Sequence, residues 1–143
     1  MRIVIVGCGR LGARLASKLD AESNDVTIID TNSRSFRRLA PGFRGDTVIG
    51  TGIDEDVLRM AGIDQADVFI SCTEGDNRNI FAAQVALLTF NVPKVFARIY
   101  DPIRADTYAT LGIDVICPTS TIADIVLQEI ETAQPERPRS TED

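Results

Sequence analysis

The chain has 143 residues, enough for one domain with a single sizeable core and too few for a second catalytic domain. Its 15 basic and 21 acidic residues give a net charge of −6, which argues against nucleic acid as a partner, because backbone phosphates need a basic surface. The sequence has neither a run of 18 apolar residues nor a secretory signal, so we expect a cytoplasmic location.

Six short, β-branched runs alternate with segments of helical character, which is typical of βαβ units. Each run is apolar at nearly every position, as in strands that helices cover on both faces of a parallel sheet. Right-handed crossovers then favour an α/β fold: a Rossmann-like, doubly wound, six-stranded sheet in the order 3-2-1-4-5-6. The predicted strands are residues 2–6, 25–30, 46–50, 67–72, 94–99 and 114–117.

A glycine-rich turn of the form GxGxxG follows the first predicted strand and opens a predicted helix. Gly7 permits the tight turn, Gly9 lets backbone N–H groups approach a pyrophosphate, and Gly12 lets the helix pack closely on the sheet. Phosphate would then lie at the helix N-terminus. Arg10 is expected to reach the phosphates, with a solvated arginine at the helix start as the alternative. The predicted turn comprises Gly7, Cys8, Gly9, Arg10, Leu11 and Gly12.

Asp30 ends the second predicted strand, 18 residues after Gly12, close to the spacing of the dinucleotide-binding fingerprint. A carboxylate there accepts hydrogen bonds from ribose hydroxyls and repels a 2′-phosphate, so NAD(H), ATP and ADP are favoured over NADP. The alternative is an aspartate that only caps a turn. Arg34 could oppose this preference by binding a 2′-phosphate, although a solvated basic face over residues 34–44 is the simpler interpretation. Thr31 and Asn32 belong to the same candidate site.

The ends of the third and fourth predicted strands meet at the same edge of the sheet and complete the candidate site. Ligands of open α/β sheets bind outside the carboxyl ends of the strands, so these residues are expected to contact the ligand. They are Gly50, Thr51, Gly52, Cys72 and Thr73. The cysteines Cys8, Cys72 and Cys117 have no CxxC spacing, which predicts small buried thiols and no metal site. Asp76 or Asn77 is expected to cap the next helix.

Residues 118–133 predict an amphipathic C-terminal helix with an apolar stripe. The stripe consists of Ile122, Ile125, Val126 and Ile130. It either meets a second subunit or packs on its own sheet. Residues 134–143 are polar and contain prolines, so the predicted organisation is one nucleotide-binding domain over residues 1–133 followed by a flexible tail.

Taken together, these motifs resemble the RCK/KTN (TrkA-N) nucleotide-binding domain of Trk/Ktr-type potassium uptake regulatory proteins over about residues 1–132. The resemblance rests on GCGRLG, VTIIDTN, VIGTGIDEDVLRMAGI, ADVFISCTEGDNRNIFAAQVA, VFARIYDP and LGIDVICPT. It implies a cytoplasmic domain that binds NAD(H) or ATP/ADP, forms a homodimer and higher-order rings, and gates a membrane potassium-translocating subunit. By the same resemblance, phosphate contacts fall to Gly9, Arg10 and Leu11, ribose to Asp30, and adenine-side contacts to Thr51 and Gly52.

The residues favour a nucleotide sensor over an enzyme, and we expect no catalytic residue. The sequence has no histidine, its two tyrosines are not followed by lysine four residues on, and it has no GxxxxGK[ST] loop. One domain of this length also leaves little room for a substrate pocket beside a cofactor. The alternative is the cofactor domain of an NAD-dependent oxidoreductase whose substrate domain lies elsewhere.

Overall fold

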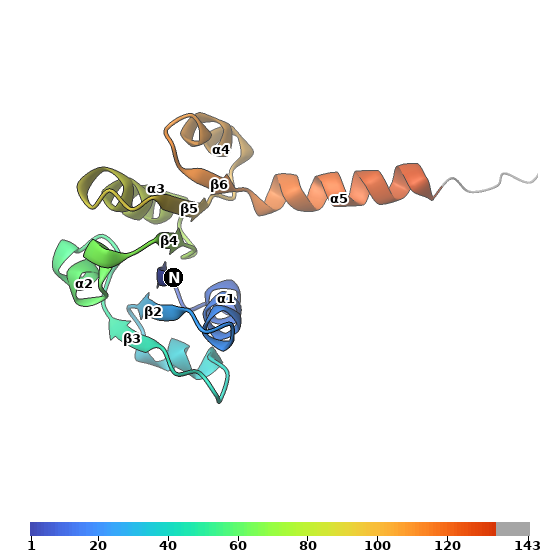
Figure 1. Ribbon diagram of the computed structural model, residues 1–143. Coiled ribbons are helices and arrows are strands. Elements are labelled where there is room, and N and C mark those ends of the chain that lie inside the picture. Colours follow the sequence, from blue (N-terminus) through green and yellow to red (C-terminus); the bar gives the residue numbers. More distant parts are fainter. Residues whose placement is uncertain (134–143) are drawn as a thin grey trace, which may run out of the picture.

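The computed structural model describes residues 1–133, and its centre is a parallel six-stranded sheet (Figure 1). The strand order is β3-β2-β1-β4-β5-β6, which confirms the predicted doubly wound topology. In the central strands of the sheet, Val6 of β1 pairs with Ile29 of β2 and with Ser71 of β4. The carboxyl ends of β1, β2 and β4 therefore lie at the same level. The strands are β1 (Arg2–Val6), β2 (Asp25–Asp30), β3 (Asp46–Ile49), β4 (Val68–Ser71), β5 (Lys94–Arg98) and β6 (Asp114–Ile116).

Five α-helices follow the strands as expected, except that β2 is followed only by a short 3₁₀ segment. That segment has one apolar residue, Phe36, which is too little to bury a longer amphipathic helix. Two further segments are the 3₁₀ turn η2 (Ile63–Gln65) and η3 (Val85–Thr89), a π-helical continuation of α3. The helices are α1 (Arg10–Ala21), η1 (Ser33–Arg38), α2 (Glu55–Met60), α3 (Asp76–Gln84), α4 (Pro102–Ala109) and α5 (Pro118–Thr132).

The core has two parts, one on each face of the sheet. On one face, α1 packs its small residues Ala13 and Ala16 against the β1 and β2 side chains, among them Ile3 and Ile28. On the other face, α2, α3 and α4 cover a larger cluster that includes Phe69 of β4. Figure 1 shows this division, with α1 on one side of the sheet and α2 and α3 on the other.

The face that carries α1 is covered only over β1 and β2, so the prediction of strands buried on both faces holds for these two of the six strands. Val68, Ile70 and Phe96 lie on β4 and β5 and are only half-buried. The reason is the course of α5, the helix that follows β6. It projects away from the sheet instead of packing back across it (Figure 1).

No residue of α5 is buried, so the structure excludes the alternative in which the apolar stripe packs on its own sheet. The side chains of Ile122, Ile125, Val126 and Ile130 are between 49% and 64% exposed. Among the described residues, no helix is both long enough and apolar enough to span a membrane. The predicted tail, residues 134–143, lies outside the described part of the chain.

The glycine-rich turn and α1 approach each other closely at Gly7 and Gly12. A Cβ atom on Gly12 would lie 1.8 Å from the carbonyl oxygen of Gly7. We therefore expect Gly12→Ala to lower the free energy of unfolding by about 3 kcal/mol or to prevent folding, because backbone must shift to admit the methyl group. Urea denaturation measures this.

Gly42→Ala is the matched control, because nothing lies within 4 Å of the position of its Cβ atom. This variant is expected to stay within about 0.5 kcal/mol of the parent chain. Equal stability of the two variants would contradict the close approach of α1 to the turn.

Candidate functional site

A cleft of about 680 Å³ opens at the carboxyl edge of the sheet. It lies beyond the carboxyl ends of the paired strands β1 and β4, where the chain continues to one side of the sheet after β1 and to the other side after β4. Ligands of doubly wound sheets bind at this switch point, and the volume lies within the range of small-molecule sites. The walls come from the glycine-rich turn, the ends of β2 and β3, and the loops after β4 and β5.

The glycine-rich turn presents backbone to the cleft. Gly7 adopts a φ of +102°, which favours glycine, and its N–H donates to the carbonyl oxygen of Ile29 at 2.8 Å. Gly9 precedes α1 and has open space where a Cβ atom would lie. No side chain caps the N-terminus of α1, so its first N–H groups are available to an anion in the cleft. Arg10 and Leu11 line the same wall.

Asp30 lines the cleft and also braces the turn. Its Oδ2 accepts the N–H of Cys8 at 2.8 Å, and its Oδ1 accepts the N–H of Asn32 at 2.8 Å. Each carboxylate oxygen has two lone pairs, so both retain capacity for a ribose hydroxyl. The turn-capping alternative and the ribose prediction are therefore compatible.

The cleft brings together all the site residues predicted from the sequence except two. Cys8 does not line the cleft: its side chain is fully buried and its Sγ contacts the carbonyl oxygen of Ser35. Gly12 faces Gly7 and serves helix packing. The predicted residues that line the cleft are Gly7, Gly9, Arg10, Leu11, Asp30, Thr31, Asn32, Thr51, Gly52, Cys72 and Thr73, and Gly50 joins them.

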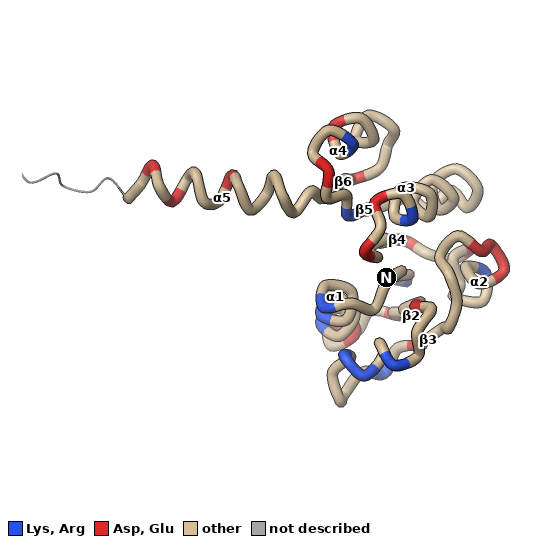
Figure 2. Tube along the Cα trace, turned by 180° about the vertical axis from the view of Figure 1, so that it is seen from behind, with Lys and Arg blue, Asp and Glu red and all other residues tan. Residues whose placement is uncertain are grey.

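Sequence reasoning missed several charged and aromatic residues of the cleft. Arg34 does not line it, whereas Arg38, on the next turn of η1, does and donates to the carbonyl oxygen of Cys8 at 3.4 Å. Figure 2 marks in blue the Lys and Arg positions along the backbone of α1 and of the segment after β2. Thr51 and Thr73 were predicted because they follow the ends of strands. The same criterion, applied to the end of β5, would have pointed to Arg98 and Tyr100. The further lining residues include Ser35, Ile53, Glu74, Arg78, Arg98 and Tyr100.

A buried amide, Asn79 of α3, holds the ends of β4 and β5 together beneath the cleft. Its side chain is 0% exposed. Its Oδ1 accepts from the Thr73 N–H at 2.8 Å, the Thr73 hydroxyl at 2.7 Å and the Ser71 hydroxyl at 3.1 Å. Its Nδ2 donates to the carbonyl oxygens of Thr73 and Arg98 at 2.9 and 2.8 Å. Both amide atoms are thus satisfied within the fold.

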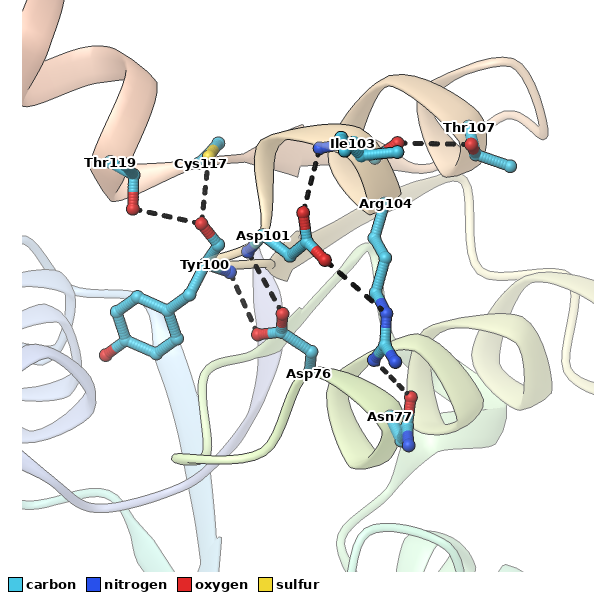
Figure 3. A network of polar contacts seen from close by, with 9 residues as sticks. All are labelled: Asp76, Asn77, Tyr100, Asp101, Ile103, Arg104, Thr107, Cys117 and Thr119. Carbon is cyan, nitrogen blue, oxygen red and sulfur yellow. Dashed lines mark hydrogen bonds and ion pairs between the residues drawn. The ribbon is translucent and has the colours of Figure 1, made fainter.

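Asp76 fixes the loop after β5, and the expectation that Asp76 or Asn77 caps its own helix is wrong. Gly75 precedes α3, and the Asp76 carboxylate accepts the N–H groups of Tyr100 and Asp101 at 2.9 and 3.1 Å (Figure 3). Asn77 instead accepts a hydrogen bond from Arg104 at 2.7 Å.

The same loop holds the base of α5. The carbonyl oxygen of Tyr100 accepts the hydroxyl of Thr119 at 2.9 Å and faces the Sγ of Cys117 at 3.6 Å (Figure 3). Because the Tyr100 side chain lines the cleft, one residue contacts both the candidate site and the start of the projecting helix.

The three cysteines are buried and free, as the sequence predicts. Burial raises the pKa of the Cys72 thiol to about 11, and the Sγ faces the carbonyl oxygen of Gly7 at 3.6 Å. Burial and, to a smaller extent, the Asp30 carboxylate raise the pKa of Cys8. Both side chains stay neutral near pH 7, so they act as packing groups and not as nucleophiles.

The parallel sheet, the switch-point cleft and the uncapped helix behind a glycine-rich turn define a Rossmann-type nucleotide-binding domain. The model of the TrkA-N domain family matches residues 3–119. The chain belongs to the TrkA-N family, which confirms the resemblance found in the sequence.

Relatives within the family are named for potassium uptake. The chain is 47% identical over 130 residues to the "Trk system potassium uptake protein TrkA" of Streptomyces coelicolor, covering 91% of this chain and 58% of that protein. It is 37% identical over 141 residues to the protein of that name from Halomonas elongata, covering 92% of this chain and 30% of that protein. The chain therefore spans 58% of the length of the first relative and 30% of the length of the second.

Solved structures agree with the fold. The TrkA-N domain of the inner membrane protein ybaL from Escherichia coli superposes with a TM-score of 0.80 at 20% identity, covering 90% of this chain and 96% of that one. The GsuK channel bound to NAD superposes with a TM-score of 0.75 at 28% identity, covering 91% and 23%. GsuK bound to ADP gives 0.75 at 28% identity, covering 92% and 34%.

The Asn79 network predicts a large stability cost for its removal. Asn79→Ala leaves buried donors and acceptors of Thr73 and Arg98 without partners, at about 1–3 kcal/mol each, so a loss of about 3 kcal/mol or more is expected in urea denaturation. Asn77→Ala, on the exposed surface of the same helix, is the control and should cost less than about 1 kcal/mol. Similar costs for both would refute the role of Asn79.

Proposed function

We propose that this domain binds an adenine nucleotide with a free 2′-hydroxyl, NAD(H), ADP or ATP, and acts as a nucleotide-sensing part of a potassium uptake system. The observation that carries the proposal is the pairing, in one cleft, of an uncapped helix N-terminus with a strand-end carboxylate. The first suits phosphates and the second suits ribose hydroxyls.

The ligand would lie across the switch point. Its phosphates would contact the N–H groups at Gly9, Arg10 and Leu11, and its ribose would bond to Asp30. Adenine would lie toward the end of β3, beside Thr51 and Gly52. This placement follows the order of the strands, because β2 and β3 lie on one side of the turn and β4 and β5 on the other.

A sensor acts through differences in affinity and needs no reaction. A nucleotide changes the state of an assembly only if it binds one conformation more tightly than another. By analogy with the potassium uptake proteins that it resembles, this domain would lie on the cytoplasmic side of the membrane and gate a potassium-translocating subunit of the Trk/Ktr type.

The projecting helix α5 would join two copies of the domain into a homodimer, on which a higher-order ring could be built. Support comes from the exposed stripe of Ile122, Ile125, Val126 and Ile130, which has no partner among the described residues. Exposed apolar side chains in such a row mark interaction surfaces. The half-buried side chains of Val68, Ile70 and Phe96 on β4 and β5 offer a second apolar surface near the base of α5.

A thermal-shift screen with ATP, ADP, NAD, NADH, NADP and NADPH tests the proposed ligand class. At a hundredfold excess over Kd a ligand adds about 2.7 kcal/mol, which for a domain of this size raises Tm by roughly 5–10 °C. At least one of the first four is expected to do so, whereas NADP and NADPH shift Tm little because their 2′-phosphate meets the Asp30 carboxylate.

Asp30→Asn should narrow the difference between NAD and NADP. It also removes a hydrogen bond that braces the turn, so the ligand-induced shifts are compared and not the Tm of the ligand-free chain. Asp64→Asn, an exposed change outside the cleft, is the control. Strongest stabilisation by NADPH, or steady turnover of NADH, would support the oxidoreductase alternative, and no shift with any nucleotide would refute a nucleotide site.

Charged substitutions in the apolar stripe of α5 test the proposed dimer. Ile125→Asp combined with Ile130→Asp is expected to convert a dimer into a folded monomer, measured by light scattering, because neither side chain is buried within its own subunit. Gln128→Asp adds a charge on the same helix outside the stripe and should leave the dimer intact. A monomeric parent chain, or a dimeric double variant, would exclude this interface.

A further inference from the structure

The chain is acidic overall, but its basic residues are not spread evenly along it. Seven arginines and lysines lie between Arg10 and Arg44, against four acidic residues, whereas the whole chain has 15 basic and 21 acidic residues. Two of the seven, Arg10 and Arg38, line the cleft. The other five are exposed and lie outside the cleft, and we call them the basic face: Arg14, Lys18, Arg34, Arg37 and Arg44.

The basic face spans two elements that are packed together. Arg14 and Lys18 lie four residues apart on α1, so they share one side of that helix. Residues 33–44 pack three apolar side chains against the cluster beneath α1, and the Arg44 N–H donates to the Asp20 carboxylate at 2.9 Å. Figure 2 marks the Lys and Arg positions of both elements in blue. The five charges therefore belong to one continuous surface of the fold.

The side chains of the basic face have no carboxylate partner. None of the ion pairs among residues 1–133 involves any of the five. Of the acidic residues in the same part of the chain, Asp20 is buried, Asp25 forms an ion pair with β1, and Asp30 lines the cleft. The fourth, Glu22, is exposed. Like charges without counterions repel one another, and an anionic partner relieves that repulsion.

The basic face is too broad for a small ligand. The 12 residues of α1 alone extend over about 18 Å, and the remaining charges lie on the neighbouring segment. A site for a small anion needs donors that converge in a concave pocket, as they do in the cleft. Charges that are spread over two elements, outside the cleft, suit an extended anionic surface instead.

The acidic remainder of the chain distinguishes between extended anionic partners. α2, which begins with Glu55 and Asp56, lies on the opposite face of the sheet from α1. A helix about 10 Å across and the sheet separate these carboxylates from a plane that touches α1, which exceeds the Debye length of about 8 Å. The basic face also exposes no aromatic side chain on which a base could stack. A planar bilayer therefore fits this face better than a nucleic acid does.

We propose that the basic face binds the anionic phospholipid headgroups of a membrane surface and turns the α1 side of the domain toward the bilayer. Clusters of about four to eight basic residues bind such lipids through charge alone. This inference goes beyond the proposed function, because the contact needs neither a nucleotide nor a potassium-translocating subunit. A domain that gates such a subunit would nevertheless work beside such a surface.

Co-sedimentation of the full chain with sucrose-loaded vesicles tests this proposal at low ionic strength. The vesicles are made of phosphatidylcholine alone or of an equimolar mixture with phosphatidylglycerol, and no nucleotide is added. The parent chain is expected to sediment with the mixed vesicles only. High salt should release it, because the Debye length falls to about 3 Å at about 1 M salt.

The triple variant Arg14→Gln, Lys18→Gln and Arg37→Gln removes three charges of the basic face. Its partition coefficient onto the mixed vesicles is expected to fall about a hundredfold, because each basic residue near an anionic surface contributes about fivefold. The side chains are exposed, and the Tm of the variant shows whether it is folded. Arg37→Gln alone, with an expected loss of about fivefold, carries the test if the triple variant does not fold.

Two controls separate the basic face from net charge and from side-chain shape. The triple variant Arg59→Gln, Lys94→Gln and Arg104→Gln makes the same change in net charge on other elements, and it should bind within about threefold of the parent chain. Arg14→Lys combined with Arg37→Lys keeps the charge of the basic face and should also bind within about threefold.

Several results would overturn the proposal. The parent chain would fail to bind the mixed vesicles, or would bind both kinds of vesicle equally, or the two triple variants would lose the same affinity. Tighter binding to a poly-dT oligonucleotide than to the mixed vesicles, lost in the variant of the basic face, would assign this face to nucleic acid. Because no nucleotide is present, failure of this test leaves the proposed nucleotide site standing.

Discussion

The backbone contact between Gly7 and Gly12 is the constraint on which the rest of this structure depends. It brings the first turn of α1 against the end of β1, so the helix begins at the switch point of the sheet and not above its middle. Any side chain at position 12 would push the helix away. Gly9 remains open to the cleft and the helix N-terminus is uncapped, so the packing at Gly12 supports both the core of this face and the proposed phosphate site.

The rest of the site is held by side chains that bond to backbone. Asp30 bonds to the N–H groups of Cys8 and Asn32, and Asn79 ties Thr73 to the end of β5. Asp76 supports the following loop in the same way. The walls of the cleft are therefore fixed relative to the sheet, which suits recognition of a ligand whose phosphates and ribose need separate partners. At Tyr100 this rigid frame also reaches the base of α5, which among the helices of residues 1–133 is the one that projects away from the sheet.

The sheet order, the glycine-rich turn and Asp30 could be predicted because each depends on local sequence. β-branched runs identify buried strands, and the spacing from Gly12 to Asp30 reports a turn followed by one helix and one strand. Arg98, Tyr100 and Asn79 were missed because their roles depend on contacts between segments distant along the chain. A buried asparagine looks like a polar surface residue until its partners are known, and Asp76 looks like a helix cap although it bonds to the next loop. The sequence also left open the direction of α5, because an apolar stripe predicts burial but does not identify the surface against which it packs.

The central claim is that phosphates bind at the start of α1, and amide chemical shifts report on this directly. In a ¹⁵N-edited NMR titration with ADP, the largest shifts are expected at Gly9, Arg10 and Leu11, with smaller ones at Gly52 beside the proposed adenine position. Gly62 lies at the opposite, amino-terminal edge of the sheet and should not move. Saturable shifts of Gly9 and Arg10 would support the account. An ADP titration that leaves these amides unmoved, or that shifts only residues outside the cleft, would contradict it.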